Sequence, residues 1–314
     1  MTEEIPEYRF ERVTGSNIKD LSRIFKESRG LNIPARLLKR KYATSFTGHE
    51  YLGYFLYDRE NNPAAFYGIF PCFVKMAGIK TLAAQTGDVI THKNHQRKGL
   101  FVKVAKKTAE LAKAEGIELL WGIPNENSLP GFLKNLDWVQ TDELRLYEWT
   151  EKGLPLYNGF QKLKIRAAYV VWRKIICLVY PGNPQKFIGS IMPAGKDCVW
   201  RDGDFNSYKS FTGNFFIQYK GLNIWAKAEN LLYIGDLENP LNFTPEKVLT
   251  ILRKFCRLMG LNGIHFEVSP DSSWDKSFSS IATSITGGPV CYYPISEASK
   301  SLRLQHTSGD IDIF

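Results

Sequence analysis

Apolar positions in the first part of the chain predict a strand followed by two helices. Tyr8 to Val13 alternates as a strand does, Ser16 to Lys26 places its apolar residues on one helical face, and Ala35 to Tyr42 is a second helical stretch. The period then changes, and three runs rich in aromatic and β-branched residues predict strands: Tyr51 to Tyr57, Ala64 to Phe70 and Phe73 to Thr91. The turns at 59–63 and 77–78 are short, which predicts antiparallel neighbours.

A helix and a buried strand are expected next. Leu100 to Glu115 repeats apolar residues at helical spacing, and Gly116 suits the position just past a helix. Ile117 to Ile123 is a short apolar run of the kind that forms a buried strand. Since strand, helix and strand in this order form a crossover, the strands before and after the helix are expected to be parallel.

The second half of the chain repeats this pattern. Asn223 to Asp236 predicts two strands, Thr244 is a helix cap, and Gly263 to Val268 predicts the strand that follows that helix. Gly87-Asp88 aligns with Gly235-Asp236, which indicates a degenerate internal duplication; the alternative is a chance likeness of two ordinary αβ units. We expect three regions: a first domain over 1–150, a helical connector over 151–199 and a second domain over 200–314.

Composition limits the class of protein. The 314 residues are 44% hydrophobic and 13% aromatic, which is enough to bury a large core. The five cysteines are widely spaced, so neither a disulfide framework nor a metal site is expected. Acidic residues Glu3, Glu4 and Glu7 stand where a signal peptide would be basic, so the expected location is cytoplasmic.

The net charge of +9 suits a polyanionic partner. No helix-turn-helix, RNP or zinc-finger pattern is present, so nucleic acid is not expected, and small phosphorylated ligands account for the charge equally well. The most apolar stretch, Ala167 to Tyr180, contains Arg173 and Lys174 and is too short to span a bilayer. It predicts an amphipathic helix packed on protein, with weak peripheral contact with an anionic membrane face as the alternative.

The segment from Gly87 to Phe101 joins a predicted strand to a predicted helix. Backbone N–H groups that converge before a helix N-terminus bind anions, because they have no partner within the helix and the helix dipole adds positive potential. Gly99 would let a pyrophosphate approach the backbone, and Arg97 and Lys98 add charge beside it. The segment therefore predicts a phosphate-binding loop.

Gln96-Arg97-Lys98-Gly99-Leu100-Phe101 resembles the Q/R-x-x-G-x-G/A motif of Gcn5-related N-acetyltransferases (GNAT). The likeness continues to residues 124–138, which look like the closing segment of that family. It implies an α+β GNAT fold, with a mixed, largely antiparallel sheet flanked by helices and a degenerate GNAT-like second half, and it implies acetyl-CoA as co-substrate. Phe101 departs from the family's small residue. Leu133 stands about where the family often has a tyrosine that protonates the leaving thiolate.

The resemblance also assigns roles. The strand before the loop, with Val89, Ile90 and Thr91, is expected to face the pantetheine arm. The loop and helix start are expected to bind the pyrophosphate, through Gln96, Arg97, Lys98, Gly99, Leu100 and Phe101. Two later asparagines, Asn125 and Asn127, are expected either to bind pantetheine amides or to cap the closing helix. Asp88 is the expected general base, with a strand-end acid in a turn or salt bridge as the alternative. His92 and His95 are further candidates, with an exposed loop position as the alternative.

The second half lacks a glycine in the slot opposite the phosphate loop, at Asn239 to Glu246, so a second coenzyme is not expected there. That half is expected to shape the acceptor pocket. His265 and Glu267 either point toward the acceptor or form a buried hydrogen-bonded pair.

The chain also resembles acetyltransferases of bacterial surface-polysaccharide (O-antigen) pathways that act on a nucleotide-linked 3-amino-3,6-dideoxyhexose. This implies an N-acetyltransferase that uses direct transfer in a ternary complex, with a nucleotide-linked amino sugar as its partner. Two alternatives stay open: a GNAT or tandem-GNAT transferase acting on protein or peptide amines, and a non-catalytic binding protein with this fold.

Overall fold

The computed structural model describes residues 7–153, 156–163, 165–312 and 314, so Glu3 and Glu4 lie outside the described residues. The chain divides into two compact units. Unit 1 comprises residues 1–141 and 290–302, and unit 2 comprises 142–289 and 303–314. The sequence analysis divides the chain at 150 and 199, whereas residues 142–199 group with unit 2.

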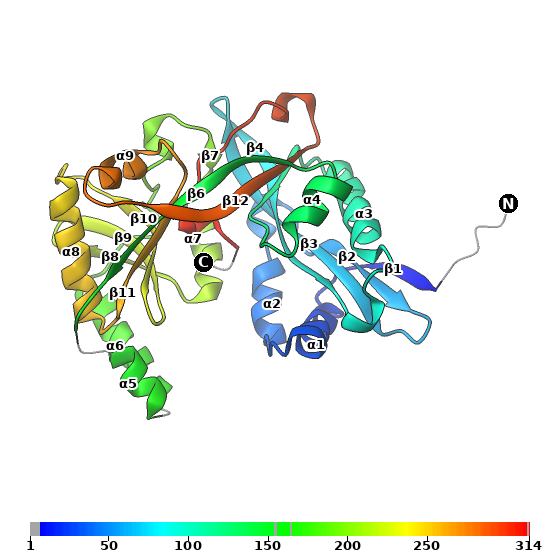
Figure 1. Cartoon of the computed structure of the whole chain (residues 1–314), viewed down its shortest axis with the longest axis horizontal. Coiled ribbons are helices and arrows are strands. Elements are labelled where there is room, and N and C mark those ends of the chain that lie inside the picture. Colours follow the sequence, from blue (N-terminus) through cyan, green and yellow to red (C-terminus); the bar gives the residue numbers. More distant parts are fainter. Residues whose placement is uncertain (1–6, 154–155, 164, 313) are drawn as a thin grey trace. The chain divides into compact units, whose positions relative to one another are not determined.

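Unit 1 is a sheet with helices on both faces (Figure 1). The strand order is β1-β2-β3-β4-β5-β12; β4 and β5 are parallel, and the pairs β1–β2, β2–β3, β3–β4 and β5–β12 are antiparallel. Only the C-terminal part of β12 belongs to this unit. The strands are β1 (Tyr8–Arg12), β2 (Leu52–Asp58), β3 (Pro63–Met76), β4 (Ile79–Thr91), β5 (Leu119–Gly122) and β12 (Ile285–Pro294).

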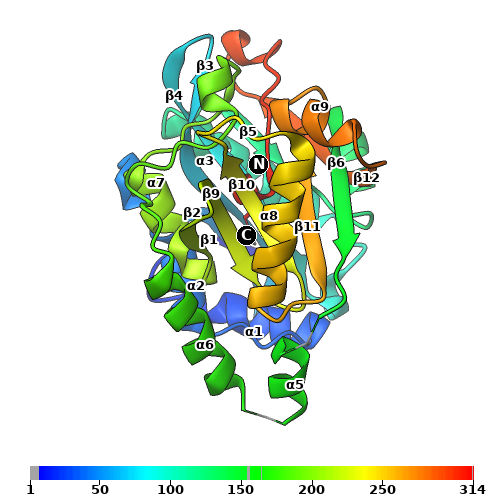
Figure 2. The same ribbon diagram turned by 90° about the vertical axis from the view of Figure 1, so that its left-hand side faces the viewer.

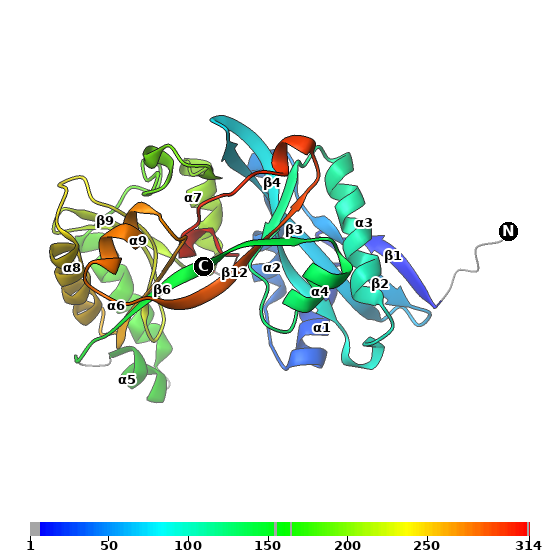
Figure 3. The ribbon, with the colours of Figure 1, turned by 45° about the horizontal axis from the view of Figure 1, so that its top comes forward.

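Alternation along the strands of unit 1 builds two cores. Phe55 and Phe66 point toward α1 (Ile18–Arg29) and α2 (Ala35–Tyr42), which supply Ile24 and Tyr42 to the same cluster. Their neighbours along β2 and β3 face α3 (Leu100–Ala114) and α4 (Leu129–Asn135) on the other side of the sheet (Figure 3). Short 3₁₀ turns lie at Ser45–Thr47, Lys93–His95 and Glu297–Ser299.

Unit 2 repeats the layered arrangement. Its strand order is β6-β11-β10-β9-β8, with β10 parallel to β11 and the other pairs antiparallel. The strands are β6 (Val139–Thr150, from Asp142 on), β8 (Phe215–Tyr219), β9 (Leu222–Ala228), β10 (Leu232–Glu238) and β11 (Gly263–Val268), and the short β7 (Cys198–Val199) lies between β6 and β8 in the sequence.

Helices cover the unit 2 sheet. In Figure 2, α8 (Pro245–Leu258) lies across β9 to β11, and α6 (Arg166–Val179) and α9 (Ser273–Ser279) share its apolar cluster. The remaining helices are α5 (Leu156–Lys162), α7 (Gly203–Lys209) and 3₁₀ turns at Met192–Ala194, Ser210–Thr212 and Ser308–Asp310. No helix in the described parts of the chain is long and apolar enough to cross a membrane.

The structure confirms the predicted α+β fold, with a mixed, largely antiparallel sheet flanked by helices. One strand boundary was wrong: the run from Phe73 to Met76 continues β3 through Pro71. Proline lacks the N–H that a ladder needs, but the pairing of β2 with β3 ends at Leu52↔Ile69, before Pro71 is reached. The turn that ends β3 is Ala77-Gly78, as predicted.

Candidate active site

Strand β4 carries a β-bulge at Asp88. The β3–β4 register passes from Gly68↔Gly87 to Phe66↔Ile90, so Asp88 and Val89 oppose Tyr67 alone. Asp88 has a φ of 54°, in the left-handed region that aspartate tolerates better than most residues. Bulges re-aim side chains and take backbone groups out of the ladder, and they are frequent beside active sites.

Helix α2 fixes the bulge by contacting the Asp88 side chain. The Lys41 ammonium lies 2.8 Å from one carboxylate oxygen, and the Tyr42 hydroxyl donates a hydrogen bond to the other at 3.2 Å. Only 10% of the Asp88 side chain is exposed. Asp88 therefore forms a salt bridge, which is the alternative to a catalytic role that the sequence left open. Its role as general base stays a prediction.

Beyond the bulge, β4 extends further than its parallel neighbour. The β4–β5 pairing covers Ala84↔Leu120 and Gln85↔Trp121, and β5 ends at Gly122 while β4 continues to Thr91. Within the described ladder, the edge of Val89, Ile90 and Thr91 that would face β5 is thus not covered by a strand, although Arg29 donates a hydrogen bond to the Val89 carbonyl at 3.3 Å. A strand edge of this kind binds extended ligands through backbone hydrogen bonds.

A histidine shapes the turn that follows β4. The His92 N–H donates to the Ala64 carbonyl at 2.8 Å, and its ring Nδ1 accepts from the Asn94 N–H at 3.3 Å. Burial lowers the pKa of His92, although Glu27, 3.5 Å from Nε2, opposes that shift. His95 is half-buried, with its Nδ1 2.9 Å from the Tyr8 hydroxyl. Neither histidine has the exposed position that the sequence analysis offered as an alternative, because both rings pack beneath the turn.

The predicted phosphate loop is exposed, and its backbone has the conformation that is typical of anion-binding loops. Arg97 and Gly99 have φ of 63° and 70°, and left-handed residues interspersed with ordinary ones turn successive N–H groups toward one point. Helix α3 begins at Leu100, and the Lys103 N–H bonds to the Gly99 carbonyl at 3.2 Å. The N–H groups of the three preceding residues therefore have no partner within the helix. A Cβ on Gly99 would meet nothing within 4 Å, so the space in front of the loop is open.

Lys98 is held away from the front of this loop. Its ammonium lies 2.9 Å from Glu7 and 3.0 Å from the Tyr8 hydroxyl, and these bonds raise the pKa of Lys98. With Lys98 bonded elsewhere, Arg97 is the basic residue closest in sequence to Gly99 that could contact a phosphate at the loop.

The departure at Phe101 has a structural explanation. The Phe101 ring turns toward α4, where it lies 5.7 Å from the Phe132 ring and 6.3 Å from the Tyr67 ring. Gly131 leaves room for it, because a Cβ there would come within 2.8 Å of Phe101. The large side chain therefore packs inward and leaves the loop unobstructed.

Asn125 caps the turn into α4. Its Oδ1 accepts hydrogen bonds from the N–H groups of Asn127 and Ser128, each at 3.1 Å. Asn125 thus has the capping role that was one of its two alternatives. Asn127 is exposed, and these bonds involve its backbone N–H and not its side chain. A contact of either residue with pantetheine stays a prediction.

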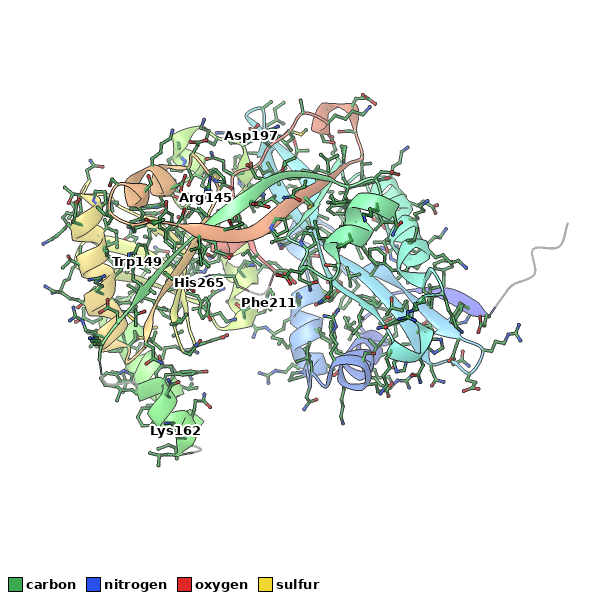
Figure 4. The ribbon with its side chains drawn as sticks, in the orientation of Figure 1. Arg145, Trp149, Lys162, Asp197, Phe211 and His265 are labelled. Atoms are coloured by element: carbon green, nitrogen blue, oxygen red, sulfur yellow. The ribbon has the colours of Figure 1, made fainter. Side chains whose placement is uncertain are left out.

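Unit 2 holds the other sequence candidates on its own sheet. His265 lies opposite Glu148 across β11 and β6, with 2.9 Å between Nδ1 and the carboxylate, and Glu267 is 3.9 Å from Nε2. Burial raises the pKa of Glu267, and His265 opposes that shift. Figure 4 labels His265 on this sheet. The predicted buried pair of His265 and Glu267 is therefore not the bond that forms: His265 bonds to Glu148, whose side chain is 49% exposed and which the local sequence pattern did not reveal.

The comparisons with known proteins agree with the motif. Residues 13–140 match the family model described as acetyltransferase (GNAT) domain. A comparison with curated proteins finds no match.

Three solved structures share the fold. A conserved protein of unknown function from Enterococcus faecalis V583, called a probable N-acyltransferase, has a TM-score of 0.57 and 11% identity, over 92% of this chain and 73% of its own. A GCN5-related N-acetyltransferase from Kribbella flavida has a TM-score of 0.56 and 10% identity, over 92% and 72%. Saccharomyces cerevisiae N-myristoyltransferase with bound myristoyl-CoA has a TM-score of 0.56 and 7% identity, over 93% and 83%.

At these identities the structures show a shared fold, and the family model adds the class of chemistry. Residues 13–140, less than half of the chain, are similar to a GNAT acetyltransferase domain, and this similarity identifies the protein as an acyltransferase.

Proposed function

We propose that the protein is an acetyl-CoA-dependent N-acetyltransferase whose acceptor is the amino group of a nucleotide-linked amino-deoxysugar. The observation that carries the acetyl-CoA part is the open loop before α3, with Arg97 and Gly99 in left-handed conformations and unpartnered N–H groups at the helix start. A pyrophosphate is the chemical group that such a loop fits. Acetyl-CoA would supply the activated thioester.

The neighbouring strand supports the same assignment. The backbone of Val89, Ile90 and Thr91 would hold the pantetheine arm along the edge of β4 that extends past β5. A backbone N–H in this stretch would donate to the thioester carbonyl and stabilise the oxyanion that forms during attack. This positioning places the thioester next to the bulge at Asp88.

Asp88 is our proposed base for the acceptor amine, acting directly or through a water. The amine must lose a proton to become a nucleophile, and a carboxylate fixed by Lys41 and Tyr42 would be well oriented to receive it. Direct attack by the neutral amine on the thioester would form the amide and release the coenzyme thiol.

The choice of an amino sugar rests on the acidity of the amine and on the resemblance of the sequence. An amino group on a sugar loses its proton more readily than a lysine side chain, whose pKa is about 10.4. A modest base or an ordered water would then suffice. This matches a site whose carboxylate is already paired with an ammonium.

Two measurements test the proposal separately. Calorimetric titration with acetyl-CoA should give one coenzyme per chain, since the loop of unit 1 alone has the open form. Turnover should then be measured with dTDP- and UDP-linked amino sugars, peptide amines and polyamines. Turnover of a lysine peptide and of none of the sugars would overturn the acceptor while leaving the acetyl-CoA assignment intact. Absence of coenzyme binding would overturn both.

A further inference from the structure

Helix α6 presents an apolar face to solvent. Tyr169 and Ile176 are buried against unit 2, whereas Val170, Val171 and Ile175, which are offset from them around the helix, are exposed. Leu178 is 79% exposed and Val171 56%, and both belong to a larger exposed apolar set on α6 and its approach: Leu163, Ile165, Val170, Val171, Ile175, Leu178 and Val179. We call this set the α6 apolar surface. Exposed apolar side chains gathered on one element in this way mark an interaction surface.

The fold holds this helix firmly, so the exposure is not that of a frayed segment. The Tyr169 hydroxyl donates to the Met259 carbonyl at 3.1 Å and the Trp172 indole to the Leu258 carbonyl at 3.3 Å, both at the end of α8. Arg173 donates to the Gly213 carbonyl at 2.9 Å. These bonds fix the inner face of α6 and leave the α6 apolar surface in a defined orientation.

The segment of the sequence that carries the α6 apolar surface has charges of one sign. Between residues 152 and 196 the sequence holds eight of its 41 Lys and Arg residues and none of its 32 Asp and Glu residues. The other residues carry 33 bases and 32 acids, so eight of the nine net positive charges belong to this segment. Lys162, labelled in Figure 4 at the end of α5, and Lys174 within α6 are both exposed.

A hollow beside α6 is also lined by basic and apolar side chains. It has a volume of about 360 Å³ and lies between Arg173, Lys174, Leu178 and the stretch Gly213–Phe215. Two cationic side chains at its border and an apolar wall suit a phosphate headgroup with its adjoining acyl chains.

We infer that α5, α6 and their basic flanks dock the protein on the surface of an anionic phospholipid bilayer. Apolar side chains of α6 enter the headgroup boundary, while the lysines meet the anionic lipids, which is the arrangement of an interfacial helix. A second copy of this chain is disfavoured as the occupant, because its surface would carry the same charge. The inference is independent of the proposed acceptor.

Flotation of the full chain with lipid vesicles tests the docking. Binding is expected to vesicles of phosphatidylcholine mixed with phosphatidylglycerol, and to weaken strongly on phosphatidylcholine alone or at high salt. Leu178→Glu should lower the partition coefficient about tenfold or more. Ile79→Glu, at a 68% exposed apolar residue of unit 1, makes the same change of charge and should leave binding unchanged.

The lysines provide a second test. Lys162→Gln with Lys174→Gln should weaken binding to the anionic vesicles, whereas the matched pair Lys19→Gln with Lys39→Gln in unit 1 should not. Unchanged melting temperatures would show that the variants are folded. The inference is overturned if the unmodified chain does not bind anionic vesicles at low salt, or if Ile79→Glu weakens binding as much as Leu178→Glu. It is also overturned if sedimentation shows a lipid-free dimer that Leu178→Glu converts to a monomer.

Discussion

Gly87-Asp88 in unit 1 and Gly235-Asp236 in unit 2 lie at the same point of two equivalent strands. In each unit the strand that precedes the crossover helix has a register irregularity at this dipeptide, and in each the aspartate pairs with a cation. Asp88 contacts Lys41, whereas the fully buried Asp236 contacts Arg201, which also binds Asp310 at 2.8 Å. The same pairing of an aspartate with a cation thus occurs at a partly accessible position in unit 1 and at a fully buried one in unit 2.

A second repeated element supports the duplication. Residues 45–48 and 210–213 both read Ser-Phe-Thr-Gly, each forms a 3₁₀ turn before the first hairpin of its unit, and each ends in a left-handed glycine, with φ of 85° at Gly48 and 81° at Gly213. Identical tetrapeptides at equivalent places favour duplication over the chance likeness of two αβ units.

The two units differ most at the start of the crossover helix. In unit 2, Thr244 caps α8 by accepting a hydrogen bond from the Lys247 N–H, and Glu246 adds negative charge in the first turn. Gly99 of unit 1 has no side chain and leaves its helix start uncapped. The fold is thus compatible with either arrangement, and of the two crossover helices it is α3 of unit 1 that has no side-chain cap.

The largest expected effect concerns the buried cation of unit 2. Arg201→Met leaves Asp236 and Asp310 buried without a counter-charge, so the free energy of unfolding should fall by about 3–5 kcal/mol. Lys41→Met in unit 1 should cost roughly half as much, because Asp88 retains some exposure and its bond with Tyr42. Urea unfolding of both variants measures the difference. A loss below about 1 kcal/mol in Arg201→Met would contradict the comparison.

Asp88→Asn tests whether the unit 1 aspartate does more than hold the bulge. If Asp88 is the base, kcat/KM should fall by about 100-fold while the Kd for acetyl-CoA stays unchanged. Lys41→Met keeps the carboxylate and removes its ion-pair partner, so it should retain more activity than Asp88→Asn. Equal losses in the two variants would instead assign Asp88 to positioning alone.

Gly99→Val should weaken acetyl-CoA binding about tenfold or more, because a side chain would stand in front of the loop N–H groups. The matched control is Gly116→Val, at the other end of α3. Both glycines are left-handed, with φ of 70° and 76°, and an added Cβ meets nothing within 4 Å at either, so the backbone strain is alike. Thermal shifts with acetyl-CoA separate the two cases: both variants should melt lower, and only Gly99→Val should lose the shift. A retained shift in Gly99→Val would remove the loop from the site.

Much of the fold could be predicted because its helices and strands follow the local periodicity of apolar residues. The helix over 35–42, the helix beginning at Leu100 and the strand over 263–268 all agree with the predicted ranges. The place of β12 could not be predicted in the same way. The part of β12 from Val290 pairs with β5 of unit 1, although it follows unit 2 in sequence, and such long-range pairing leaves no local signal.

The candidate site shows the same limit. Its loop follows from the order of residues 96–101, whereas the partners of its side chains depend on the tertiary fold. Neither the Lys41 contact with Asp88 nor the Glu7 contact with Lys98 is visible in the sequence. A signal that sequence reasoning missed is the repeated Ser-Phe-Thr-Gly, which marks the helix-and-turn element that brings Lys41 to Asp88.

The smallest expected effect concerns the turn after the bulged strand, which the two units cap with different side chains. In unit 1 the His92 ring accepts the Asn94 N–H, and in unit 2 the amide oxygen of Asn239 accepts the Phe243 N–H at 2.9 Å. A histidine accepts such a bond only while it is neutral. Burial lowers the pKa of His92, so the folded protein keeps it neutral while the unfolded chain takes up a proton near pH 6.5.

The contribution of His92 to stability is therefore fully present above about pH 6.5, is lost as the pH falls through that value, and levels off below the pKa of the folded state. His92→Asn would give unit 1 the cap of unit 2, with an oxygen near the place of Nδ1 and no titration. The Kd for acetyl-CoA of the unmodified protein should rise about twofold to threefold more than that of His92→Asn when the pH is lowered from neutral to a value, well below 6.5, at which His92 takes up its proton in the folded state, because that protonation loosens the turn that leads into the loop. Parallel titrations at both pH values measure this ratio. Identical pH dependence in the two proteins would show that the His92 cap does not support the loop, and that the turn of unit 1 is held by its backbone bond to Ala64 alone.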